Sequence, residues 1–136
     1  MEAVKKVGLA TIKDGALLLC RKRGLDLLIL PGGKIELGEE PLDCLAREIA
    51  EELGEVEVRN PEYVGSYSDV MAGDGVKIIE IVLYTGELAG CPRASSEIAE
   101  LVWFRPDGDW SELAPSLSNK ILPDLIAREI LPQDNI

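Results

Sequence analysis

The sequence predicts an α/β or α+β sandwich, in which strands surround a helix in mid-chain and a second helix closes the chain. Three patterns predict it. Short apolar segments separated by turn residues occupy both halves of the chain, one amphipathic segment lies between them, and the last apolar segment has helical character. With 136 residues, 46% of them hydrophobic, we expect one domain over residues 1–136 that buries a core without disulfide or metal staples.

The first elements are expected to be strands. Residues 7–12 and 16–21 are apolar, and Asp14-Gly15 between them is a hairpin-turn signal. A third short apolar run, residues 25–30, ends at Pro31-Gly32-Gly33. Two glycines at this point allow the backbone to approach a ligand closely.

A helix is expected from Pro41 to Leu53. Proline suits the first helical position, and Gly54 suits the residue just beyond the end. Its apolar residues recur at helical spacing and predict one buried stripe. The stripe consists of Leu42, Leu45, Ile49 and Leu53. Cys44 is expected to be a packing residue beside it.

The second half of the chain is expected to return to strands. The expected elements are short strand pieces in 55–70 around Asn60-Pro61, a turn at 71–75, a long strand at 76–88, a loop at 90–96, a strand at 101–104 and a helix in 116–131. Pro123 either begins that helix or kinks it. The pattern does not determine how the strands pair.

The chain has no histidine, which excludes Ser-His and Cys-His nucleophilic catalysis and any histidine metal site. The three cysteines, Cys20, Cys44 and Cys91, are odd in number and scattered. They favour a reduced, cytoplasmic protein over a disulfide scaffold or a zinc site. The apolar runs are far shorter than a membrane span, and no basic-then-apolar signal segment is visible, so we expect no membrane association.

The charge is strongly acidic and concentrated. The net charge is -11, and residues 36–57 alone contain nine acids and one base, Arg47. This balance is opposite to that of a phosphate-backbone binder, so we do not expect nucleic-acid binding. Glu48, Glu51 and Glu52 are expected to share one ridge of the helix, opposite the apolar stripe.

Clustered carboxylates at these spacings cost a helix a few tenths of a kcal/mol per pair, roughly. The cluster becomes favourable when a divalent cation binds it. Ligands that are all oxygen favour a hard ion, so we expect Mg²⁺, with Mn²⁺ as a substitute. Bound Mg²⁺ usually keeps waters and takes phosphate oxygens as its remaining ligands.

The glycines and the acidic helix together resemble the Nudix box, GX5EX7REUXEEXGU, in which U is a bulky aliphatic residue. Residues 33–55 match at every fixed position except the last, where Glu55 stands in place of the aliphatic residue and Val56 follows it. The matching positions are Gly33, Glu39, Arg47, Glu48, Ile49, Glu51, Glu52 and Gly54. The chain length and the order of elements also suit this family.

The resemblance implies a Nudix-type α/β/α sandwich with a mixed sheet, the box helix in mid-chain and a C-terminal helix. It implies Mg²⁺-dependent cleavage of a nucleoside diphosphate linked to another group. In family terms the metal ligands are Glu48, Glu51, Glu52 and the carbonyl of Gly32. Glu39 and Arg47 then orient these carboxylates through charge-assisted hydrogen bonds.

The general base that takes the water's proton is left open between Glu48, the first choice, and a glutamate in a downstream loop. Family members often supply a further metal ligand or base shortly before a Trp-Phe strand. Here that pattern precedes Trp103-Phe104 and points to Glu97, with Glu100 as the alternative. The expected catalytic residues are therefore Glu48, Glu51 and Glu97.

Basic residues near the box are candidates for binding substrate phosphate. Lys34 directly follows the two glycines, and Arg21 and Arg23 end the second expected strand. Trp103 and Phe104 could stack on a base or pack in the core. We expect a small nucleotide as the binding partner, and a homodimer is left open because many relatives dimerise.

The short chain most resembles MutT-like nucleoside triphosphate pyrophosphohydrolases, which release a nucleoside monophosphate and pyrophosphate. ADP-ribose and dinucleoside polyphosphate hydrolases are alternatives. Their downstream markers are absent, since no proline lies between Pro61 and Pro92 and no tyrosine between Tyr67 and Tyr84. A non-catalytic nucleotide sensor is a further alternative, but such domains usually have a broken box.

Overall fold

The computed structural model describes residues 3–71 and 74–132. In chain order its elements are β1 (Ala3–Ala10), β2 (Ile12–Lys13), β3 (Ala16–Lys22), β4 (Gly32–Lys34), α1 (Pro41–Leu53), β5 (Glu57–Met71), β6 (Asp74–Ala89), β7 (Ile98–Phe104), the 3₁₀ turn η1 (Trp110–Glu112), the π-helical turn η2 (Leu117–Ile121) and α2 (Leu122–Ala127). No helix in these residues is both long and apolar enough to cross a membrane.

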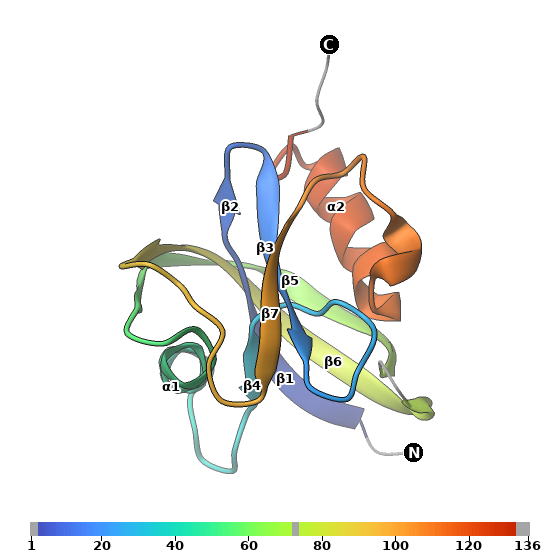
Figure 1. Cartoon of the computed structure of the whole chain (residues 1–136). Helices are drawn as coiled ribbons and strands as arrows, with labels where there is room; N and C mark the ends of the chain where they lie inside the picture. The colour runs from blue at the N-terminus through green and yellow to red at the C-terminus, as the bar shows by residue number, and fades with distance from the viewer. Residues whose placement is uncertain (1–2, 72–73, 133–136) are drawn as a thin grey trace.

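The strands form two sheets between two helical layers. One sheet has the order β4-β1-β6-β5 and the other β2-β3-β7. The first sheet is mixed, because β1 pairs with β6 in parallel, whereas β1–β4 and β5–β6 are antiparallel. Helix α1 and the C-terminal helical segment lie on opposite sides of the strands (Figure 1). The α/β/α sandwich with a mixed sheet, a mid-chain helix and a C-terminal helix is therefore confirmed.

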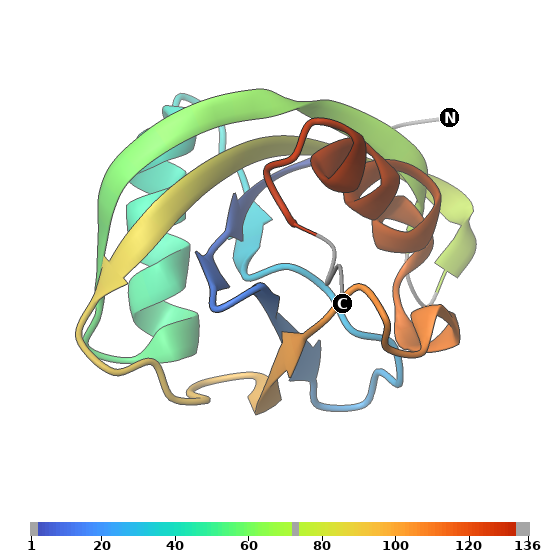
Figure 2. The same ribbon diagram turned by 90° about the horizontal axis from the view of Figure 1, so that it is seen from above.

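Alternation along the strands builds two cores. In β3, Leu18 packs with α1, whereas Leu17 and Leu19 on the other face pack with the C-terminal segment. Seen from above, the long β5–β6 hairpin curves from α1 to the C-terminal segment and covers both (Figure 2). The core beneath α1 contains Val7, Leu9, Leu18, Cys44, Leu45, Ile49 and Leu53.

The predicted bounds of α1 are confirmed at both ends. Pro41 begins the helix, and Gly54 ends it at a positive φ of 83°. Cys44 is buried as expected, but Leu42 is 45% exposed, so its predicted place in the apolar stripe is wrong. Leu42 lies in the first turn, and the face that packs on the strands begins at Cys44.

The predicted hairpin at Asp14-Gly15 is also confirmed. It joins β2 to β3, with φ values of 52° and 78° at its two central residues. Two successive positive φ values are those of a type I′ turn, whose twist matches the flanking strands.

The prediction of short strand pieces before residue 71 is wrong, because β5 is continuous over 15 residues. A register shift between Arg59 and Glu62 accommodates Asn60, at φ 52°, and Pro61. β5 lies at the edge of its sheet, where proline's missing N–H is tolerated. The turn expected at 71–75 is narrower, since Met71 pairs with Asp74, and residues 72–73 lie outside the described residues.

The helix predicted in residues 116–131 is shorter than expected. Helix α2 ends at Ala127, and the chain reverses through Glu129 at φ 58°. The N–H groups of Ile130 and Leu131 then donate to the Leu125 carbonyl, which caps the helix. Pro123 stands in the first turn of α2, directly after the π-helical turn, so it begins the α-helical part of a longer helical segment.

Candidate active site

Four carboxylates and three lysines line one pocket between α1, β1 and the loop before β7. We call it the acidic pocket; its volume is about 440 Å³. The carboxylates are Glu48, Glu51, Glu52 and Glu97, and the lysines are Lys6, Lys22 and Lys34. The structure therefore brings together residues that are up to 91 positions apart in the sequence. All four glutamates predicted as metal ligands are among them.

Glu52 is buried, with 5% of its surface exposed, and its Oε1 accepts a 2.9 Å hydrogen bond from the backbone N–H of Gly32. Burial raises its pKa to about 7, although the Gly32 hydrogen bond acts in the opposite direction. The expectation that Glu52 lies opposite the apolar stripe is wrong: it faces inward beside Leu53. Gly32 itself, whose carbonyl was predicted as a ligand, does not line the acidic pocket: its N–H binds Glu52, and the residue lines the adjoining apolar cavity.

Glu48 lies against the backbone of β4. A Cβ at Gly33 would stand 2.2 Å from the Glu48 carboxyl carbon, so only glycine leaves room for this side chain. Glu48 Oε1 also accepts a 2.8 Å hydrogen bond from Arg47 Nη1. Glu51 is more exposed, and its carboxylate lies 3.8 Å from the same Arg47 nitrogen.

Arg47 holds Glu39 with two parallel hydrogen bonds, from Nε and Nη2, each 2.9 Å long. Glu39 also accepts a 3.1 Å bond from the Glu36 N–H. The Arg47 bonds lower the pKa of Glu39 to about 2, and the pKa of Arg47 is raised above its ordinary value. Through Arg47, Glu39 in the loop is connected to Glu48 and Glu51 on α1.

The loop before β7 carries Glu97 into the pocket. The N–H groups of Arg93 and Ser95 donate to the Leu53 and Glu52 carbonyls. These carbonyls lie in the last turn of α1, where the helix itself supplies no donor. Ser96 follows in the left-handed region, at φ 57°. Glu100, the alternative to Glu97, does not line the pocket among the described residues; it forms an ion pair with Arg21.

The structure does not bring Arg21 to the acidic pocket. Its Nε donates to the Asp26 carbonyl at 2.9 Å, and its guanidinium pairs with Glu100 and Glu112. These partners hold Arg21 over the β3–β7 pair, so the predicted phosphate contact has no geometric support. Arg23 is exposed and also absent from the lining, whereas Lys34 lines the pocket as expected.

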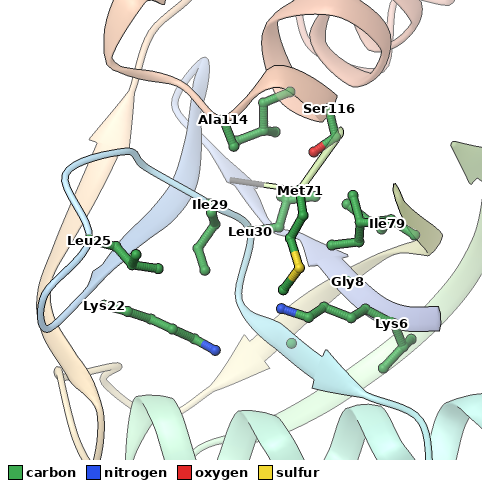
Figure 3. A pocket seen from close by; sticks show the side chains of 14 residues that line it. Lys6, Gly8, Lys22, Leu25, Ile29, Leu30, Met71, Ile79, Ala114 and Ser116 are labelled. Carbon is green, nitrogen blue, oxygen red and sulfur yellow. The ribbon is translucent and has the colours of Figure 1, made fainter. Parts of the chain in front are cut away.

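Sequence reasoning missed Lys6 of β1 and Lys22 of β3. Their amino groups point toward each other and into the same space (Figure 3). Burial, and then the positive charge of Lys22, lower the pKa of Lys6. Period-2 alternation could have found Lys6, since it lies on the same face of β1 as Gly8 and buried Ala10. The register shift beside Lys22 left no signal in the sequence.

An apolar cavity of about 120 Å³ adjoins the acidic pocket, with Lys6, Lys22 and Met71 lining both (Figure 3). A single water needs only about 10–15 Å³, so the cavity has room for a small organic group. Its aliphatic lining comes from Leu25, Ile29, Leu30, Ile79, Ile81 and Leu117. Ser116 adds a hydroxyl. Trp103 and Phe104 do not line it: Trp103 is partly exposed, and Phe104 packs in the core.

The donors of the acidic pocket suit a hard divalent cation in chemical type, since they are carboxylate oxygens. In this arrangement, no three Asp, Glu or Cys side chains within residues 3–71 and 74–132 converge on one point as metal ligands. In the same arrangement, Arg47 holds Glu48 and the Gly32 N–H holds Glu52.

Comparison with known proteins agrees with the box and the fold. A family model of the NUDIX domain matches residues 4–124. A MutT-like protein of Streptomyces ambofaciens is 31% identical over 125 residues, which cover 92% of this chain and 78% of that protein. These matches include the whole of the box at residues 33–55.

Solved structures show the same architecture. The E. coli ORF135 protein is 29% identical, with a TM-score of 0.74 over 98% of this chain and 96% of that one. A NUDIX hydrolase from Nitrosomonas europaea has a TM-score of 0.76 over 98% of each chain at 21% identity, which shows a shared fold. The chain therefore belongs to the Nudix family and is a MutT-like Nudix hydrolase.

Proposed function

We propose that this pyrophosphohydrolase cleaves a nucleoside triphosphate to a nucleoside monophosphate and pyrophosphate with the help of Mg²⁺. The observation that carries the proposal is the adjacency of the two spaces described above. An apolar cavity suits a nucleobase, and a pocket with four carboxylates beside it suits metal-bound phosphates. The match to a relative described as a MutT-like protein, over 92% of this chain, also supports the proposal.

Nudix hydrolases generally use a divalent metal, and we assign Mg²⁺ to the acidic pocket, with Mn²⁺ as a substitute. Glu48, Glu51, Glu52 and Glu97 would hold it, together with the carbonyl of Gly32. Bound there, the metal would neutralise phosphate oxygens and lower the pKa of the attacking water. The Gly32 N–H and Arg47 hold the side chains of Glu52 and Glu48 in place, as partners of metal ligands commonly do.

In the proposed reaction, the water oxygen bonds to one phosphorus of the anhydride while the bond from that phosphorus to the bridging oxygen breaks. One water proton passes to a carboxylate, which acts as general base. Glu48 is our first candidate because it lines the pocket against the Gly33 backbone, and Glu97 is the second. Lys34, which lines the same pocket, is a candidate contact for the phosphates.

A nucleotide panel with and without Mg²⁺ tests the proposal, with products separated by chromatography. The panel contains standard and oxidised triphosphates, ADP-ribose, diadenosine polyphosphates and sugar nucleotides. We expect a triphosphate to be the best substrate and to yield monophosphate plus pyrophosphate. Cleavage of ADP-ribose or a dinucleotide alone would overturn the triphosphate assignment. Binding of Mg²⁺ and nucleotide without any cleavage would instead indicate a sensor.

A cytoplasmic location remains part of this proposal. Cys20, Cys44 and Cys91 are all unpaired, and two of them are buried. Free thiols suit a reducing compartment.

A further inference from the structure

Lys6 and Lys22 form a cationic pair where the apolar cavity meets the acidic pocket. Both line both spaces, and no other charged residue among the described ones does. Lys6 comes from the middle of β1 and Lys22 from the end of β3, so two strands of different sheets place the pair. Each belongs to the sheet framework rather than to a loop.

Within the described part of the chain, the pair has no carboxylate partner of its own. Among residues 3–71 and 74–132, neither lysine is within ion-pair distance of an acidic side chain, although Glu48 and Glu52 line the same pocket. Two ammonium groups that point at each other repel, and partial burial adds a desolvation cost. A sequence selected for stability alone would avoid the pair, whereas an anion bound between the two would make it favourable.

The position of the pair identifies the anion. A nucleotide with its base in the apolar cavity and its outer phosphates over the carboxylates must cross the junction between them. The sugar and the 5′-phosphate lie between the base and the outer phosphates, and of these two groups only the 5′-phosphate is an anion. An ammonium group has donors only and carries a positive charge, so it is suited to hold charged phosphate oxygens.

We propose that Lys6 and Lys22 bind the nucleoside 5′-phosphate and so fix the direction in which the substrate lies. This rests on the proposed function, and adds to it two positioning residues that act on the phosphate nearest the base. They favour substrates in which a nucleoside is joined directly to the phosphate chain, and they distinguish these from free pyrophosphate. The Lys34 amino group lines only the acidic pocket and is left for the outer phosphates.

The test measures binding rather than turnover. Calorimetry compares the common nucleoside 5′-monophosphates, the corresponding nucleosides and inorganic pyrophosphate with Mg²⁺, on wild type, Lys6→Met and Lys22→Met. A lost charge-assisted contact costs about 10-fold or more in affinity. We expect the monophosphate Kd to rise by about that factor in each variant, while the Kd values of nucleoside and pyrophosphate stay the same.

Two further variants separate this role from a structural one. Lys5→Met is the matched control, because Lys5 precedes Lys6 on β1 but is exposed and lines neither space. Lys6→Arg keeps the charge and should recover part of the monophosphate affinity. Methionine keeps the apolar stem of lysine, so we expect the thermal unfolding temperature of Lys6→Met to be at least as high as that of wild type.

Unchanged monophosphate affinity in both methionine variants would overturn the inference. An equal loss for pyrophosphate would also overturn it, because the lysines would then attract any anion to the pocket. The inference and the proposed function fail separately. If wild type cleaves triphosphates but the variants bind monophosphate normally, only the inference falls. If no triphosphate is cleaved but the monophosphate effect appears, the lysine site stands and the substrate assignment falls.

Discussion

The backbone N–H of Gly32 donates a 2.9 Å hydrogen bond to the carboxylate of Glu52, and this bond joins β4 to the inner face of α1. It places a buried acid beside the strand that carries the two glycines of the box. The cost of burying Glu52 is only partly offset by this bond, since its pKa remains raised. Such a carboxylate is poised for a ligand that carries positive charge.

The first prediction concerns stability and pH without divalent metal. The pKa of Glu52 is raised from 4.5 to about 7 because burial disfavours the carboxylate. A raised folded-state pKa gives stability that is fully present below about 4.5 and is lost as pH rises through about 7. Relative to Glu52→Gln, the free energy of unfolding of wild type should fall by roughly 3 kcal/mol between pH 4.5 and 8.

Urea unfolding in EDTA, at several pH values, measures this difference. Saturating Mg²⁺ should remove most of the fall, because a bound cation favours the ionised carboxylate. Parallel pH profiles for wild type and Glu52→Gln would show that Glu52 ionises normally in the folded protein.

A second prediction follows from the two parallel bonds between Arg47 and Glu39. Lysine cannot form this forked contact, so Arg47→Lys should leave Glu48 and Glu51 less well oriented. We expect a loss of about 10–100-fold in Mg²⁺-dependent turnover or metal affinity. Arg59→Lys is the control, because the Arg59 side chain is exposed and its one ion pair among the described residues is with Glu57, at 4.0 Å. Steady-state kinetics measures this difference. Equal rates for Arg47→Lys and Arg59→Lys would contradict the assigned role of Arg47.

The third prediction separates two glutamates of one segment. Glu97 lines the acidic pocket, whereas Glu100 pairs with Arg21 on the surface. Glu97→Gln should slow turnover by about 100-fold or more if Glu97 is a ligand or base. Glu100→Gln should leave turnover within about twofold, because a surface ion pair contributes little. If the measured kcat falls more in Glu100→Gln than in Glu97→Gln, the role of ligand or base belongs to Glu100.

Gly32 and Gly33 give a fourth prediction, because they are adjacent but constrained differently. A Cβ at Gly32 would lie 2.0 Å from the Val7 carbonyl oxygen, and the φ of Gly32 is 144°. Gly32→Ala should therefore destabilise the β1–β4 pairing by about 1–3 kcal/mol or more. At Gly33 the three atoms nearest to the Cβ all belong to the Glu48 side chain, which can turn away. Gly33→Ala should therefore reduce turnover but lower the free energy of unfolding less than Gly32→Ala does. Thermal unfolding and kinetics of the two variants, compared directly, check this contrast.

The sequence predicted the local elements well where a short pattern determines them. Pro41 and Gly54 bound α1, and Asp14-Gly15 determines the type I′ hairpin, because each depends on the φ preference of a single residue. The box spacing likewise located Glu48, Glu51 and Glu52, three of the four glutamates that line the acidic pocket. Asn60-Pro61 misled the prediction, since edge position and a register shift, both tertiary features, allow β5 to continue.

The rest of the site depends on contacts between distant segments. Lys6 reaches the junction because β1 pairs with both β4 and β6, and no local pattern predicts this pairing. Arg21 was expected at the phosphates from its place in the sequence, but Glu100 and Glu112 hold it elsewhere. Glu52 was expected on an exposed ridge, but the Gly32 N–H binds it from inside the fold.

The central claim is that Glu52 and the other glutamates of the acidic pocket hold the metal that hydrolysis requires. The most direct measurement is the initial rate of Mg²⁺-dependent hydrolysis of the best triphosphate substrate by wild type, Glu52→Gln and the control Asp43→Asn, an exposed acid on the same helix. Glutamine can still accept the Gly32 N–H, so the fold should survive. We predict a loss of more than about 100-fold for Glu52→Gln, near wild-type rates for Asp43→Asn, and no lower unfolding temperature in Glu52→Gln. Turnover of Glu52→Gln near the wild-type level would contradict the claim.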